Sequence, residues 1–156
     1  MTDENTAVEA DFDLEDDYKP APLIPTGAFP GAITSATFEG VKLSFMVTLN
    51  DTNSLMSDGE TSVDGAVLPY NVWFPKAGDD QVLIKSGTMS KRQWKINNAK
   101  KVADSLKVNL NTRTVITEAI QDGEWVGIPV SVKVDIREYK GEISNEITDI
   151  ARGVEE

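Results

Sequence analysis

One-for-one alternation of apolar and polar residues is the feature that most restricts the folds open to this chain. Residues 41–49 place five apolar side chains on one face of an extended segment, and residues 130–137 place four more in the same pattern. An α-helix does not gather such residues on one side, because its period is 3.6 residues whereas that of a strand is two. The chain is therefore predicted to build a sheet with one buried face and one open face.

Two other segments have the composition of strands and carry a mark of their position in the sheet. Residues 28–38 are rich in Thr, Ile and Phe, and Pro30 and Gly31 predict a bulge or bend near the start of that strand. Residues 66–74 alternate again, and Pro69 predicts an edge strand or a bulged one, because proline has no amide hydrogen to donate.

Turn residues connect these strands. Residues 50–65 combine Asn, Asp, Ser and Thr with two glycines and predict a long polar loop. Lys140 and Gly141 suit a two-residue hairpin turn, after which residues 143–150 return along residues 130–137. The C-terminal part of the chain is therefore predicted to be a β-hairpin.

A helix is predicted over residues 91–106. Ser90 stands at the N-cap position with Gln93 three residues later, which is the spacing of a capping box. The apolar residues recur at intervals of three and four and form one stripe, with Val102 at its edge: Ile96, Ala99, Ala103 and Leu106. A short second helix is predicted near residues 115–120.

Three strands, a helix and a hairpin follow one another along the chain. This is the element order of a mainly β fold, the five-stranded oligonucleotide-binding (OB) Greek-key barrel with one amphipathic helix between strands 3 and 4. Antiparallel meanders with one inserted helix also occur in sandwiches and other α+β folds, so the element order leaves these open.

The charges of the chain are segregated. The formal net charge of −11 argues by itself against nucleic-acid binding, which needs Lys and Arg to neutralise phosphates. However, residues 1–19 contain eight acids and one lysine, a net charge of −7, whereas residues 85–113 contain eight cations and one acid, a net charge of +7. The basic segment indicates a polyanionic partner. The acidic segment indicates either electrostatic self-inhibition or an arm that only keeps the protein in solution.

Three prolines separate the acidic segment from the first strand. Pro20, Pro22 and Pro25 favour an extended linker. Residues 1–22 are therefore predicted to be a disordered acidic arm with its linker, and residues 23–153 to be the folded domain. If the arm inhibits, it competes with a nucleic acid as a phosphate mimic.

The absence of two residue types excludes several classes of catalytic and metal site. The chain has no cysteine, which excludes thiol nucleophiles and thiolate metal sites, and no histidine, which excludes imidazole bases and triads. No enzymatic activity, cofactor or metal is therefore predicted. No apolar run approaches the ~20 residues of a membrane span, and residues 1–4 are acidic where a signal peptide is basic, so a cytoplasmic location without a membrane partner is expected.

Four short motifs give the chain a family likeness. They are the run from Leu23 to Ile33, Gln93-Trp94-Lys95-Ile96 in the basic helix, the run from Gly127 to Val132, and Lys140 to Ile147. With these motifs, roughly residues 23–150 resemble bacteriophage single-stranded-DNA-binding proteins of the OB fold, in which an opening Pro-Gly strand, a mid-chain helix and a closing hairpin recur. The acidic segment departs from this resemblance, because better-known proteins of this functional class carry it at the C-terminal tip.

The basic helix supplies the first candidate DNA-binding residues. Non-specific binding of single strands needs cations along the phosphates and aromatic faces for the bases. The helix offers both: Lys91, Arg92, Trp94, Lys95 and Lys101. The alternative is a solvated helix with Trp94 tucked under a neighbouring loop.

The outward faces of the strands supply the second set of candidates. If residues 41–49 and 66–74 pair, Trp73 and Asn71 share a face with Lys42, Ser44 and Met46, and the hairpin adds Lys133, Arg137 and Tyr139. An outward Trp beside Lys and Asn is what a base-stacking platform requires. The alternative is that Trp73 is covered by the 50–65 loop or by a second subunit.

Charged residues near the hairpin turn give a weaker, enzymatic alternative. Asp135, Glu138 and Lys140, with Asp122 as a partner acid, resemble the Glu-x-Lys element of Mg²⁺-dependent restriction-type nucleases. Against this, Lys140 precedes Gly141 in a predicted turn, so it does not project from a strand together with Glu138.

The sequence thus predicts a non-enzymatic protein that binds single-stranded DNA in phage replication or recombination, without strong sequence preference. The expected partners are single-stranded DNA, replication or recombination proteins reached through the arm, and a second copy of the chain. The expected location is the cytoplasm of the host cell. The competing prediction is a structural or protein-interaction β module, such as a virion component, whose basic helix docks an acidic partner.

Overall fold

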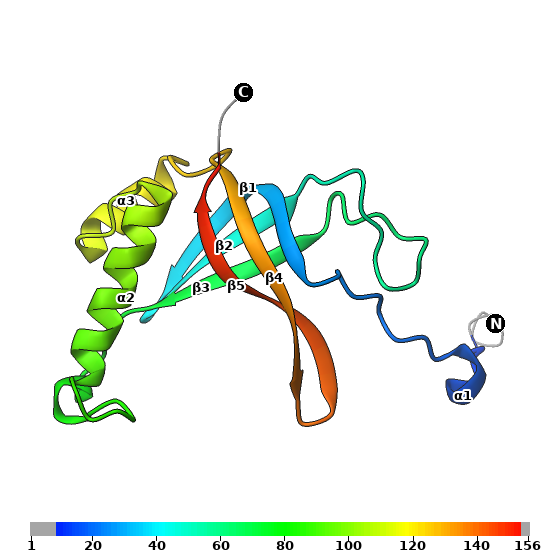
Figure 1. The fold of residues 1–156 in the computed structure, drawn as a ribbon, viewed down its shortest axis with the longest axis horizontal. Helices are drawn as coiled ribbons and strands as arrows, with labels where there is room; N and C mark the ends of the chain where they lie inside the picture. Colours follow the sequence, from blue (N-terminus) through cyan, green and yellow to red (C-terminus); the bar gives the residue numbers. More distant parts are fainter. Residues whose placement is uncertain (1–8, 154–156) are drawn as a thin grey trace, which may run out of the picture.

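The computed structural model describes residues 9–153 and is built on one five-stranded sheet with two longer helices beside it (Figure 1). The strands are β1 (Gly27–Glu39), β2 (Lys42–Leu49), β3 (Val67–Trp73), β4 (Pro129–Tyr139) and β5 (Glu142–Arg152). The helices are α1 (Leu14–Asp17), the 3-10 turn η2 (Asp79–Gln81), α2 (Lys91–Leu106) and α3 (Arg113–Gln121). The predicted mainly β class with five strands is confirmed.

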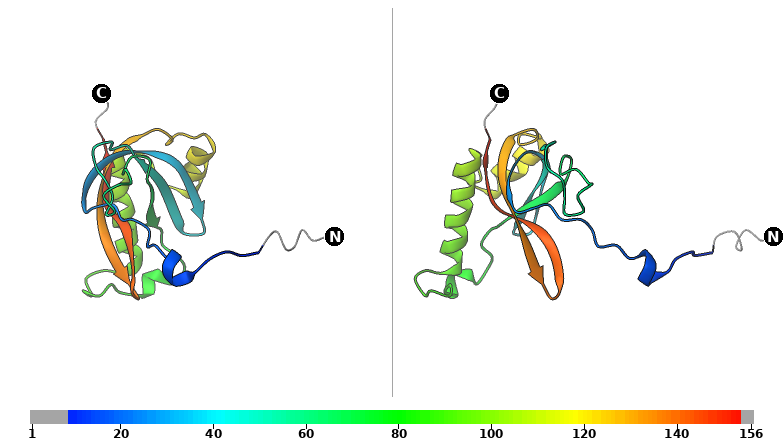
Figure 2. Two further views of the ribbon diagram at one scale, coloured as in Figure 1. Left: turned by 90° about the vertical axis from the view of Figure 1, so that its right-hand side faces the viewer. Right: turned by 45° about the vertical axis from the view of Figure 1, so that its right-hand side comes forward.

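The strands follow the order β3-β2-β1-β4-β5, and every neighbouring pair is antiparallel. β3 is an edge strand, as Pro69 predicts. β3 and β5 lie close to one another, but no strand pairing joins them among the described residues. The sheet is therefore open. Helix α2 packs against both edge strands and lies beside the open side (Figure 2).

Alternation gives the sheet its two faces. On β2, Leu43, Phe45, Val47 and Leu49 are buried, while the residues between them are half-buried on the other face. Trp125, in the loop before β4, packs on Phe45 with 5.4 Å between ring centres. Truncating a buried aromatic such as Phe45 to Ala costs about 3–5 kcal/mol, so this face carries much of the stability.

Both ends of α2 are fixed by polar contacts. Ser90 accepts a hydrogen bond from the Gln93 amide at 3.1 Å, which confirms the predicted cap, but the Gln93 side chain donates to Asn97 instead of returning to Ser90. At the other end, Arg152 of β5 donates to the Leu106 carbonyl at 2.8 Å. This bond ties the last turn of the helix to the edge of the sheet.

The buried faces of the two helices follow the predicted stripes with one shift. On α2, Val102 is buried rather than at the edge, whereas Ile96 is only half-buried. The predicted second helix is confirmed as α3, which buries Ile116 and Ala119. In the described part of the chain, no helix has the length and apolarity needed to cross a bilayer.

The irregularity of β1 lies further along the strand than predicted. Pro30 pairs in register with Ser131, and the register against β2 shifts only between Ile33 and Ser35. Gly31 does not mark the irregularity. A Cβ at this position would lie 2.7 Å from the carbonyl oxygen of Thr48 on β2. A glycine is therefore required for close approach of the two backbones, not for a bend.

The N-terminal segment joins the domain at Leu23, against the 50–65 loop, and at Ile24, against β5. Residues 9–21 are exposed and contain the single-turn helix α1, while residues 1–8 of the predicted arm lie outside the described residues. The Leu23 amide donates to Ser57 Oγ at 2.8 Å. The Asn145 side chain accepts from the Ile24 amide and donates to the Ile24 carbonyl, each at 2.8 Å.

Candidate nucleic-acid interface

The outer face of β2 and β3 carries polar and aromatic side chains in register. Lys42 is paired with Trp73, and Ser44 with Asn71. The Lys42 ammonium lies 5.8 Å from the Trp73 ring centre, and the Ser44 hydroxyl donates to Asn71 Oδ1. Trp73 keeps 49% of its surface exposed. The predicted shared face is confirmed, and half of Trp73 is open to solvent.

The hairpin of β4 and β5 forms a second wall beside Trp73. A cleft of about 430 Å³, here called the Trp73 cleft, is lined by Asn71 and Trp73 of β3, Arg137 of β4, and Ser144 and Glu146 of β5. Its volume falls within the ordinary range of ligand sites, ~300–1,000 Å³. Arg137 donates to Glu146 at 3.0 Å, so the acid orients the guanidinium and offsets part of its charge.

A smaller hollow of about 80 Å³ continues along β5. It is lined by Asn98 and Lys101 of α2 and by Thr148 and Asp149 of β5, and it shares Tyr70 with the Trp73 cleft. Burial raises the pKa of the Tyr70 hydroxyl, and the Asp149 carboxylate raises that pKa further. At neutral pH this hydroxyl is therefore a protonated hydrogen-bond donor between the two hollows.

Trp94 stands on the same side of α2 as this hollow. Positions four and seven residues later on the helix are Asn98 and Lys101, which fall on one stripe with it. Trp94 is 49% exposed, like Trp73, whereas Trp125 is 5% exposed in the core. Two half-exposed indoles thus accompany these hollows: Trp73 lines the Trp73 cleft, and Trp94 shares a helical stripe with two residues of the smaller hollow.

The cations of α2 do not form a single track. Lys101 faces the hollow beside β5, whereas Arg92 and Lys100 line a groove on the side of α3. Lys91 is exposed in the first turn and lines neither surface.

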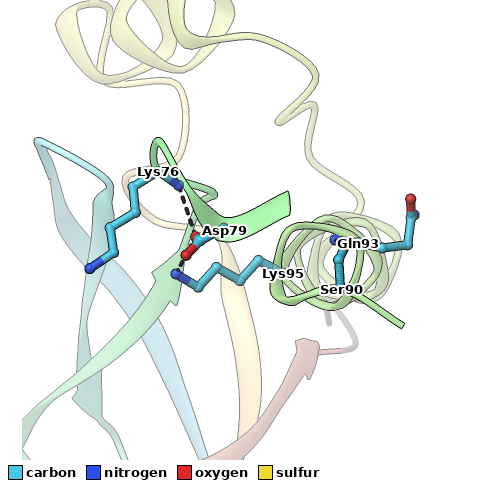
Figure 3. Close-up of polar contacts among 5 residues, drawn as sticks. All are labelled: Lys76, Asp79, Ser90, Gln93 and Lys95. Carbon is cyan, nitrogen blue, oxygen red and sulfur yellow. Dashed lines mark hydrogen bonds and ion pairs between the residues drawn. The ribbon is translucent and has the colours of Figure 1, made fainter. Parts of the chain in front are cut away.

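Lys95 is directed into the fold (Figure 3). Its ammonium donates to Asp79 Oδ2 at 2.8 Å, and the same oxygen accepts the Lys76 amide at 2.9 Å. The Asp79 side chain is only 5% exposed. The hydrogen bond from Lys95, followed by that from the Lys76 amide, holds the pKa of the Asp79 carboxyl below its ordinary value. Lys95 therefore anchors the start of α2, and its charge is paired within the fold.

The remaining predicted residues lie away from the Trp73 cleft. Lys133 is exposed on β4 opposite Asp149, beside the bulge of that strand. Tyr139 is exposed at the end of the hairpin, with the Lys140 ammonium 5.4 Å from its ring centre. Neither residue lines the Trp73 cleft or the hollow beside it.

Several interface residues were not singled out from the sequence. A two-residue turn at Lys140-Gly141 fixes the register that pairs Arg137 with Ser144, so Ser144 and, two residues on, Glu146 follow from that turn. Tyr70 gave no such signal, because alternation places it on the inward face of β3. It reaches the interface only because β3 is at the open edge.

The acids considered for metal binding do not assemble. Asp122 follows α3 near the start of β4, whereas Glu138 lies at the opposite end of that strand. Lys140 occupies the hairpin turn with a φ of 52°, and Asp135 accepts a hydrogen bond from the Thr148 hydroxyl at 3.0 Å. Within residues 9–153, no three acidic side chains are placed to share a metal ion.

Comparison with known proteins adds no family to this geometry. No protein-family model matches the chain, and no curated protein matches it. What the chain binds is therefore inferred from its surface.

Proposed function

We propose that the chain binds single-stranded DNA along a track that runs from the Trp73 cleft past Tyr70 to Lys101 and Trp94. The observation that carries this proposal is a pair of half-exposed tryptophans beside two hollows that share Tyr70: Trp73 lines the first hollow, and Trp94 lies on the helical stripe of Asn98 and Lys101, which line the second. Bases of single strands stack on such faces, each worth about 1–3 kcal/mol, and they do so without sequence preference.

Cations and neutral polar groups support the same proposal. Lys42, Arg137 and Lys101 border the track and are available to contact phosphates. Asn71 and Asn98 offer both donors and acceptors to unpaired base edges. Glu146 and Asp149 also line the track, and their repulsion of phosphates keeps the affinity moderate, most of all at low salt.

We propose that the fold is an OB-type barrel with its last seam open. The strand order β3-β2-β1-β4-β5 supports this, because pairing of β5 with β3 is the one step that closes it into a five-stranded barrel. The position of α2 between β3 and β4 in the chain, and against β3 and β5 in space, also supports it. From this fold and the motifs noted above, we further propose that the protein acts in phage DNA replication or recombination and has no catalytic activity.

The test is a titration of the full-length protein with oligo-dT at two salt concentrations, followed by tryptophan fluorescence. We expect quenching and an affinity that falls with salt, with a log-log slope near −0.7 per neutralised phosphate. Salt-independent binding, or a preference for duplex DNA in competition, overturns the proposal. No binding at low salt favours the protein-interaction module instead.

A further inference from the structure

The side of α2 that faces α3 carries a groove unlike the DNA track. Two adjoining hollows of about 350 and 220 Å³ share Phe74, Pro75, Leu110 and Asn111, and together they form what we call the α2–α3 groove. Ile96, Ala99 and Ala103 add to its apolar floor. Three cations stand at its rim, namely Arg92, Lys100 and Arg113.

The rim is positive and has little internal compensation. Among the described residues, neither hollow is lined by Asp or Glu. Lys100 pairs with Asp104 at 2.9 Å, but both side chains are more than half exposed, and such pairs hold weakly. Arg113 donates to the Gly40 carbonyl and lies 4.7 Å from the Phe38 ring centre, neither of which neutralises its charge. The groove therefore suits a segment that is both acidic and apolar.

The chain itself contains such a segment. Residues 11–18 read Asp-Phe-Asp-Leu-Glu-Asp-Asp-Tyr, five acids with three large apolar side chains between them. Phe12, Leu14 and Tyr18 are 65%, 77% and 72% exposed, so no part of the domain covers them. Burying three such side chains in an apolar groove is favourable by about 25 cal/mol per Å² removed from water.

The segment does not reach the groove of its own domain. The N-terminal segment that carries α1 runs away from the domain on the side opposite α2 and α3 (Figures 1 and 2), and the domain holds the chain at Ile24, through Asn145. Fully extended, it spans at most about 22 Å from Ile24 to Tyr18 and about 43 Å to Phe12. A domain of this size is about 36 Å across, so the path over its surface to the far side is about 55 Å.

We infer that residues 11–18 of one copy dock in the α2–α3 groove of a second copy. The acids face the rim cations, and the three apolar side chains cover the floor. The Trp73 cleft is a poorer host for this segment, because Glu146 already lines it. The inference is independent of DNA binding, since the groove and the track lie on different sides of α2.

Sedimentation of the full-length chain tests this inference. We expect self-association that weakens with rising salt. The double variant Arg92→Glu/Lys100→Glu should weaken association by about tenfold or more, because two rim charges are reversed. The matched control, Lys85→Glu/Lys91→Glu, makes the same change in net charge at exposed positions outside the groove and should leave association unchanged. A monomer at every concentration, or equal effects of the two double variants, overturns the inference.

Cross-linking separates docking between copies from docking within one. Because the chain has no cysteine, Tyr18→Cys and Asn111→Cys introduce a single pair of thiols. Under oxidation we expect disulfide-linked dimers or larger species from the double variant, and heterodimers when the two single variants are mixed. Gln121→Cys, at the exposed end of α3, replaces Asn111→Cys in the control. An internally cross-linked monomer, or no more cross-linking than in the control, contradicts docking on a second copy.

Discussion

Both sides of helix α2 carry cations, but the two sides suit different ligands. On the β5 side, Lys101 accompanies Trp94, polar side chains and the carboxylate of Asp149. On the α3 side, Arg92 and Lys100 stand over an apolar floor without an acid among the described lining residues. The first surface offers stacking and hydrogen bonds, and the second offers charge over a hydrophobic groove. A count of cations along a helix therefore does not define one binding surface.

The largest expected effect concerns base stacking on Trp73, at the cleft end of the DNA track. Trp73→Ala should weaken binding of oligo-dT about tenfold or more, because one base loses its aromatic partner. Arg92→Ala, on the groove side, is the comparison and should leave the DNA affinity nearly unchanged. Both affinities are measured by fluorescence anisotropy of a labelled oligonucleotide. Equal losses in the two variants would mean that the two sides of α2 are not distinct for DNA.

The second effect is on stability, because Asp79 holds the start of α2 against which both surfaces are built. Its pKa is lower in the folded than in the unfolded chain, so its stabilising contribution is full above about pH 4 and is lost as pH falls through the lowered value. Asp79→Asn should lower Tm by several degrees at pH 7.

The difference in Tm between wild type and Asp79→Asn should shrink as the pH falls below about 4. Thermal scans followed by circular dichroism check this dependence. Asp80→Asn, an exposed neighbour, is the control and should match the wild type at each pH. A pH-independent difference would assign the effect of Asp79 to shape rather than to charge.

A neighbouring pair of lysines provides the third and sharpest comparison. Lys101→Ala should weaken oligo-dT binding a few-fold and reduce the magnitude of the salt slope by about 0.7, the loss of one phosphate contact. Lys100→Ala removes the same charge one residue earlier, on the groove side, and should change neither quantity measurably. Titrations over a series of salt concentrations give both slopes. A larger effect of Lys100→Ala than of Lys101→Ala would indicate that DNA binds in the α2–α3 groove instead.

The smallest expected effect is a gain in affinity. Glu146→Gln removes a carboxylate from the Trp73 cleft and frees Arg137 for a phosphate. Oligo-dT binding should tighten about twofold at low salt and less at high salt, since exposed ion pairs are weak and screened. Glu142→Gln, at the exposed start of β5, is the matched control. A loss of affinity would show that Glu146 positions Arg137 for binding instead of competing with the ligand.

Local sequence patterns predicted most helices and strands, but not which side chains from distant parts of the chain come together. The alternation around Phe45 and the cap at Ser90 located β2 and α2, because both are set by neighbours in the chain. The partner of Lys95 was out of reach, because Asp79 lies sixteen residues away and its burial depends on how the loop before α2 folds back. The same holds for Asn145 and Ile24, whose contact joins the two ends of the domain.

The burial of Trp125 gives this protein two separate optical signals. An indole packed against Phe45 emits at shorter wavelength than the two half-exposed indoles, and a soluble quencher such as acrylamide reaches it least. Blue-edge emission therefore follows the integrity of the core, while red-edge emission follows events at the surface. A single sample, scanned in both windows, distinguishes a variant that has lost its ligand from one that has begun to unfold.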